Sequence, residues 1–262
     1  MNFIKLEIKR RLENRITLSV VVLYLLFYSY INYKMGNIYF ISNSNFYMRL
    51  FFLSPDTIET TNFLYFILPI MAALIGSDVL AEDLRSKWFI NVISRYNAKK
   101  YYYSCCFVSF LCSGFVMVIP YIIDFIIKIA IYPINYPSIT MDASFPTEIG
   151  MSSIFVYHPM IYTLLAILFT FLFSGLVGLI GFTVSLFTTK KLIISSSPFI
   201  LNIIVWNIVN IFGIKSFTID TILIFRIVQN MFSLKELILF FILSSLVVFL
   251  IIYLRGKKYD FI

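Results

Sequence analysis

Six segments of this chain are apolar and long enough to cross a lipid bilayer as helices. Crossing about 30 Å of hydrocarbon takes roughly 20 helical residues. The six segments are residues 16–33, 62–80, 103–131, 160–187, 192–212 and 237–254. Hydrophobic residues make up 60% of the chain and charged residues only 13%, against about 45–50% and 25% in soluble domains. We therefore expect an all-α, polytopic membrane protein in which residues 1–262 form a single transmembrane domain with no separate soluble part.

Lysine and arginine are distributed unevenly between the two sides of these six segments. Fifteen lie in residues 1–15, in the loop 81–102, in the turn 188–191 and after the last segment, and six lie on the other side. Cytoplasmic flanks carry the excess of basic residues, so both termini are predicted to lie in the cytoplasm. The net charge of +8 follows this pattern and does not indicate nucleic-acid binding. The abundance of Ile, Phe, Tyr, Asn and Lys is typical of an AT-rich bacterial genome, which suggests a bacterial cell membrane.

Residues 1–15 have the pattern of an amphipathic helix. Apolar residues recur at four-residue steps, and basic residues lie largely elsewhere around the helix: Ile4, Ile8, Leu12 and Ile16 against Lys5, Lys9, Arg10 and Arg11. Such a helix lies parallel to the inner leaflet and leads into the first span as an elbow. The alternative is a basic flank that orients the span and has no fixed structure.

The loop 81–102 combines charge with apolar residues. Asp78, Glu82 and Arg85 step along one helix face where the second segment leaves the membrane. A short helix with Trp88, Val92 and Tyr96 on one side is expected next, and Asn97-Ala98-Lys99-Lys100 ends it. These apolar side chains either anchor the loop in the membrane surface or dock on a protein partner.

On the outer side, residues 213–236 are too apolar for a free loop and too interrupted by polar residues for a seventh span. A short helix that lies on, or dips into, the outer membrane surface fits both properties.

Two patterns within the spans point to helix contacts. Small residues at steps of four, three and four, Ser174, Gly178, Gly181 and Ser185, allow another helix to approach closely, either within the chain or in a second subunit. Asn202, Trp206 and Asn210 share a face of the fifth segment. They could line a translocation path or form hydrogen bonds between helices. Asp124 and Lys128, four residues apart, are predicted to pair with each other.

The sequence contains few of the residue patterns that are typical of nucleotide-binding, metal-binding or catalytic sites. It contains no phosphate-binding Gly-x-x-x-x-Gly-Lys-Ser/Thr loop, so the chain does not bind ATP in that way. His158 is the single histidine, which leaves too few ligands for a catalytic zinc site. Cys105, Cys106 and Cys112 share one span and have no metal-ligand spacing, so we predict neither a disulfide nor a metal site. No catalytic residue is expected, and any energy source must be on another chain.

In the loop, the acidic pair Glu82-Asp83 and the basic Arg85 are followed by an apolar stretch from Trp88 to Ile93 and then by Ser94-Arg95. This motif resembles that of the permease subunits of ABC-2-type ABC transporters. Ser86-Lys87 stands where the family commonly has Gly-Thr, and the proline often found before Ser-Arg is absent. The layout of elbow, six spans and short re-entrant helices before the last span (here 217–228) also matches.

The resemblance implies a permease that docks on a separate ATPase subunit and pairs with a second permease, identical or related. ATP and magnesium would bind the ATPase, and this chain would carry no cofactor. The contact would be made by the coupling segment: Glu82, Asp83, Arg85, Trp88, Phe89, Val92 and Arg95. Cargo would be a hydrophobic or amphipathic molecule such as a peptide, toxin, drug or lipid. Two rival functions remain open, an ion-coupled secondary transporter and a non-transport membrane protein of the immunity or sensor type.

Overall fold

The computed structural model describes residues 3–38, 46–50, 58–93, 97–134, 151–212 and 233–256. Every regular element in these ranges is a helix. The helices are α1 (Phe3–Leu12), α2 (Arg15–Ile38), α3 (Phe46–Arg49), α4 (Ile58–Gly76), α5 (Val79–Arg85), α6 (Trp88–Ile93), α7 (Ala98–Ile131), α8 (Ser152–Tyr157), α9 (Pro159–Ser185), α10 (Lys191–Phe212) and α12 (Leu234–Gly256). The prediction of an all-helical protein is confirmed for the part of the chain described.

Five of these helices, α2, α7, α9, α10 and α12, are long and apolar enough to cross a membrane, as expected for a multi-pass membrane protein. The predicted second segment, 62–80, is also helical, but α4 ends at Gly76 and α5 begins at Val79. The apolar part of α4, Phe66–Gly76, is shorter than the other five. The break falls at Ser77-Asp78, where a charged residue interrupts the apolar run.

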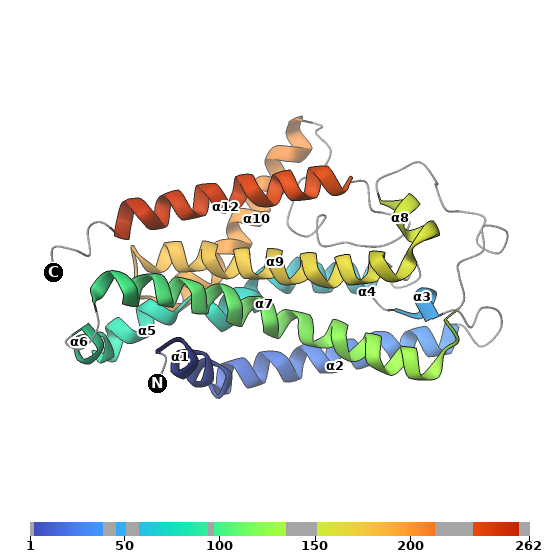
Figure 1. Cartoon of the computed structure of the whole chain (residues 1–262), viewed down its shortest axis with the longest axis horizontal. Helices are drawn as coiled ribbons and strands as arrows, with labels where there is room; N and C mark the ends of the chain where they lie inside the picture. The colour runs from blue at the N-terminus through green and yellow to red at the C-terminus, as the bar shows by residue number, and fades with distance from the viewer. Residues whose placement is uncertain are drawn as a thin grey trace.

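The helices α7 and α9 form the centre of the bundle (Figure 1). Burial covers 61% of the apolar stretch of each, against 22% for α10 and 17% for α12. The helix α7 has 34 residues and is therefore about 51 Å long, which exceeds the hydrocarbon thickness and requires tilt or projection. It begins earlier than predicted because Asn97 caps it: the Asn97 side-chain oxygen accepts a hydrogen bond from the Lys99 amide at 2.9 Å.

Small residues set the close packing at this centre. A Cβ atom added to Gly178 would lie 2.3 Å from the Ser113 hydroxyl of α7, and one added to Gly181 would lie 2.4 Å from the Ser77 Cβ. Ser174 and Ser185 on the same helix are buried. The stripe of small residues on α9 thus packs inside the chain, which was the first of the two sequence-based interpretations.

The elements gather at two ends of the bundle (Figure 1). The helices α1, α5 and α6 lie at one end together with the start of α7 and the last turn of α12, and α3 and α8 lie at the other. The start of α10 joins the first group, since Lys191 contacts Asp78. The basic segments that the sequence assigns to one membrane face therefore lie together in the fold.

Candidate functional site

The helix α1 turns a mixed face toward the bundle. Glu7 and Arg11 are buried, and Ile4 and Ile8 pack against the core, mainly on α7. Leu12, which the sequence placed on the same apolar face, is exposed. The predicted helix is present, and Ile4 and Ile8 of its predicted apolar face pack on the core. The sequence did not predict that Glu7 and Arg11 are buried on the same side, where Arg11 contacts Asp78 and Glu82.

Asp78 is the centre of a buried charge cluster formed by α1, α5 and α10. The Arg11 guanidinium lies 2.9 Å from one Asp78 oxygen and 2.6 Å from a Glu82 oxygen. Arg11 also donates to the Val79 carbonyl at 3.2 Å. The Lys191 ammonium lies 3.0 Å from the second Asp78 oxygen. Burying a charge is costly unless it is paired, so these contacts make α1 and the start of α10 depend on one carboxylate.

Asp83 carries a second set of contacts one turn further along α5. Its carboxylate is fully buried, accepts a hydrogen bond from the Tyr101 hydroxyl at 2.5 Å, and forms an ion pair with Arg10. Arg10 in turn contacts Glu7 at 3.2 Å. Asp83 thereby connects α1 with α5 and α7. The Arg85 guanidinium lies 3.8 Å from Asp78. We name these residues the charge cluster: Glu7, Arg10, Arg11, Asp78, Glu82, Asp83, Arg85, Tyr101 and Lys191.

Within the charge cluster, the surroundings shift the pKa values of Glu7 and Arg10. Burial raises the pKa of Glu7, and the nearby Asp83 charge raises it further. Burial alone would lower the pKa of Arg10, but the hydrogen bond to Asp83 and its charge outweigh that effect, so the pKa is raised. The surroundings therefore favour the charged form of Arg10, which is paired with Asp83, and disfavour the ionised form of Glu7.

The short helix α6 follows a strained residue. Lys87 has φ of 57°, in the left-handed region that favours glycine, and the chain reverses there between α5 and α6. Phe89 packs on the Tyr101 ring at a centroid distance of 5.6 Å, and Val92 is buried. Trp88 and Ile90 are exposed by 39% and 64%. Trp88 and Val92 were predicted to share one side, but the structure places them in different environments.

The predicted coupling residues divide into three groups. Glu82, Arg85 and Trp88 are partly exposed, Phe89 is half-buried, and Asp83 and Val92 are buried. Arg95 and Tyr96 lie outside the described residues, as do residues 213–232 of the predicted outer segment. The Asp83 side chain is buried and its contacts are within the chain, so it is not part of the exposed surface.

Sequence reasoning missed five members of the charge cluster: Glu7, Arg10, Arg11, Tyr101 and Lys191. The basic residues were interpreted as orienting charges at a lipid surface. One signal was available, since Asp78, Glu82 and Asp83 follow a span directly and need partners if they are buried. Which of the many nearby basic residues supplies them depends on the fold.

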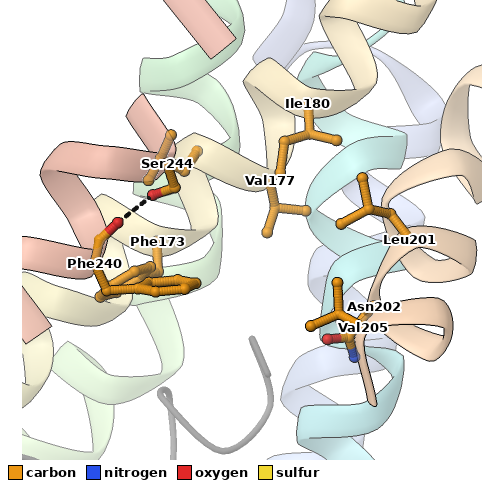
Figure 2. A pocket seen from close by; sticks show the side chains of 9 residues that line it. Phe173, Val177, Ile180, Leu201, Asn202, Val205, Phe240 and Ser244 are labelled. Carbon is orange, nitrogen blue, oxygen red and sulfur yellow. Dashed lines mark hydrogen bonds between the residues drawn. The ribbon is translucent and has the colours of Figure 1, made fainter. Parts of the chain in front are cut away.

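Of the predicted path residues of α10, the structure describes the side chains of Asn202 and Trp206. Asn202 is buried and lines a cavity of about 100 Å³ between α9, α10 and α12 (Figure 2). Trp206 is 48% exposed and is not part of the cavity wall. The Asn210 side chain lies outside what the structure describes.

The predicted Asp124–Lys128 pair is confirmed toward the end of the bundle that carries α3 and α8. The Lys128 ammonium lies 3.1 Å from Asp124, and the Tyr28 hydroxyl of α2 donates to the same carboxylate at 2.6 Å. Both charged side chains are buried. The pair therefore connects α7 with α2.

Among the residues described, no cluster of three or more His, Cys, Asp or Glu side chains is arranged to hold a metal ion. Cys105, Cys106 and Cys112 are buried free thiols. No family model, curated protein or solved structure matches the chain.

Proposed function

We propose that this chain is the transmembrane permease subunit of an ATP-driven ABC exporter. Its six spans are α2, α4, α7, α9, α10 and α12, α1 is the elbow helix at the inner leaflet, and α6 is the coupling helix. Both termini lie in the cytoplasm of a bacterial cell. The chain works with ABC ATPase subunits, which bind ATP and magnesium, and with a second permease, identical or related. It moves a hydrophobic or amphipathic molecule (a peptide, toxin, drug or lipid) outward by alternating access.

The observation that carries this proposal is the way α6 is supported. A six-residue helix is too short to be stable alone. Here Phe89 and Val92 fix it to the bundle, while Trp88 and Ile90 remain exposed. An exposed apolar pair on a fixed short helix suits protein docking, because a well-packed aromatic side chain is a typical anchor of an interface.

The contacts behind α6 provide a route for movement. A displacement of α6 would be transmitted to α7 through the contact between Phe89 and Tyr101, and to α5 through the turn at Lys87. From α5, Asp83 and Asp78 connect to α1 and to the first residue of α10. Four elements therefore respond to one docking point. In this mechanism Asp78 and Asp83 are positioning residues, and the contact itself is made by Glu82, Arg85, Trp88 and Arg95.

Affinity purification of the full chain from its native membrane in mild detergent tests the proposal. We expect an ABC ATPase to co-purify and its ATP hydrolysis to rise in the complex. Trp88→Ala and Arg95→Ala should each reduce both the recovered ATPase and transport. Tyr157→Ala is the matched control, because Tyr157 is an exposed aromatic residue on α8 at the opposite end of the bundle. Unchanged association and transport in both variants would contradict the proposal.

One observation favours an ion-coupled secondary transporter as a second candidate. Such carriers use buried ionisable residues within the membrane, and Asp124 with Lys128 is a buried pair on a span. The two candidates differ in their energy source. Transport that stops on ATP depletion with the ion gradient clamped supports the exporter, and transport that stops only when the gradient is collapsed supports the secondary transporter. A sensor or immunity protein would show neither.

A further inference from the structure

The cavity between α9, α10 and α12 has almost entirely apolar walls (Figure 2). Its volume is about 100 Å³. The lining residues are Phe173, Leu176, Val177, Ile180, Leu201, Asn202, Val205, Phe240 and Ser244. The Ser244 hydroxyl donates to the Phe240 carbonyl of its own helix at 2.7 Å, so it does not require a polar ligand. A polar group placed here would lose its water without adequate compensation.

One residue of the cavity wall, Leu201, also belongs to the exposed surface of the described bundle. This side chain lines the cavity and is also 43% exposed. Ile200 and Ile204 beside it on α10 are exposed, as are Leu243 and Val247 on α12. Both α10 and α12 are long and apolar enough to cross a membrane, where their exposed side chains would face hydrocarbon and not water.

We propose that this cavity binds the hydrocarbon chain of a membrane phospholipid, which enters past Leu201. An open apolar space in contact with lipid gains dispersion contacts when a chain segment fills it. An engineered apolar cavity of about 150 Å³ is large enough for benzene, so this smaller cavity suits a few methylene groups and excludes a headgroup. The inference does not depend on the exporter proposal, because it needs neither an ATPase nor a second permease.

The position of the cavity gives such a lipid a structural role. Both α10 and α12 pack on α9, and they are the least buried of the spanning helices. A segment of acyl chain would fill the cavity that Val177 of α9 and Leu201 of α10 line. The bound lipid would therefore hold two weakly supported helices at their observed separation.

Photolabelling tests the inference on the full-length protein. The protein is placed in nanodiscs of phosphatidylcholine and phosphatidylglycerol that contain phosphatidylcholine with a diazirine near the end of one acyl chain. After illumination, mass spectrometry maps the adducts. We expect peptides covering residues 173–180 and 201–205 to be labelled more than the outer face of α12. Val205→Phe, which fills the cavity, should lower the labelling of residues 173–180 about tenfold, equivalent to a penalty of about 1.4 kcal/mol on chain binding.

Val22→Phe is the matched control, because it makes the same change at an exposed position of α2, which does not line the cavity, and should leave labelling unchanged. If Val205→Phe does not fold, Leu201→Phe in the cavity wall is used, with Leu23→Phe at an exposed position of α2 as its control. Labelling of the cavity no higher than that of the outer face of α12 would overturn the inference and would mean that another part of the protein fills the space. Equal labelling in the cavity and control variants would overturn it too.

Discussion

Arg11 and Lys9 lie on the same ten-residue helix but in opposite environments. The Arg11 side chain is 2% exposed and bridges Asp78 and Glu82, whereas Lys9 and its partner Glu13 are 72% and 67% exposed and 3.7 Å apart. Removing one partner of a buried ion pair leaves an uncompensated charge, while an exposed pair is screened by water. The contribution of a basic residue in α1 to stability therefore depends on whether its side chain is buried against the bundle or exposed.

This contrast gives a paired prediction. Arg11→Gln should lower the free energy of unfolding by about 3–5 kcal/mol and release α1 to limited proteolysis. Lys9→Gln, the matched control on the same helix, should change it by less than about 1 kcal/mol. Thermal unfolding of both variants in the same detergent provides the measurement. Equal losses in the two variants would show that α1 is not held by the charge cluster.

Lys87 is a non-glycine residue in a strained backbone conformation, with φ of 57°. An L-residue in the left-handed region costs roughly 1–2 kcal/mol, and glycine adopts this conformation without that cost but loses about 0.5–1 kcal/mol in backbone entropy. Lys87→Gly should therefore raise the free energy of unfolding by up to about 1 kcal/mol.

The control for this change is Lys100→Gly, at an exposed position in the first turn of α7. There the same substitution should destabilise by about 0.5–1 kcal/mol, because the helix has no strain to relieve. Opposite signs in thermal unfolding are expected. A loss of similar size at both positions would mean that the turn at Lys87 gains nothing from glycine.

What the sequence could reveal at this scale depended on the separation of the residues involved. The Asp124–Lys128 pair was predictable because residues four apart are neighbours on one helix. The Arg11–Asp78 contact joins residues 67 positions apart, and no local pattern distinguishes Arg11 from the other basic residues of α1. Local pairs followed from spacing, and long-range pairs required the fold.

At the scale of elements, all six predicted spans are helical, since their apolar length is a local property. Their boundaries were less predictable. The helix α7, capped by Asn97, begins at Ala98, five residues before the predicted 103, and the charged Asp78 separates α4 from α5. The predicted apolar residues Ile4 and Ile8 of α1 do pack on the core, but the burial of Arg11 was not predictable, because its partners Asp78 and Glu82 are distant in the sequence.

The contact between α7 and α9 depends on two small residues facing each other. Gly178→Ala would place a Cβ 2.7 Å from the Ser113 Cβ and 3.1 Å from the Ser109 carbonyl oxygen, so the helices must separate. Overpacking of this kind typically costs about 1–3 kcal/mol. We expect a loss of that size in thermal unfolding.

A second substitution tests whether the clash is the cause. Ser113→Gly removes the facing Cβ and should recover part of the stability lost in Gly178→Ala, so that the double variant is more stable than the sum of the two single changes implies. Ser113→Gly alone loses the hydrogen bond that Ser113 donates to the Ala72 carbonyl at 2.8 Å. Strict additivity would show that Gly178 and Ser113 do not oppose each other.

At the scale of the whole molecule, the segments rich in lysine and arginine lie at one end of the bundle, as their distribution along the sequence predicted. The charge cluster and α6 lie at the end that carries α1, and α8 lies at the other end (Figure 1). Charge counting could predict this grouping because the membrane forces charged segments to one face or the other. It could not predict that the same charges form a buried cluster.

Site-specific labelling tests the orientation of the bundle in the membrane. Cys105, Cys106 and Cys112 are buried, so replacing them with alanine gives a background for single exposed cysteines. Ile90→Cys on α6 and Tyr157→Cys on α8 are 64% and 72% exposed at opposite ends in the unaltered chain. If the end with the charge cluster is cytoplasmic, a membrane-impermeant maleimide added to intact cells should label Tyr157→Cys and not Ile90→Cys. The pattern should reverse in inside-out vesicles, and labelling of both positions from one side would contradict a membrane-crossing bundle with α6 and α8 at opposite faces.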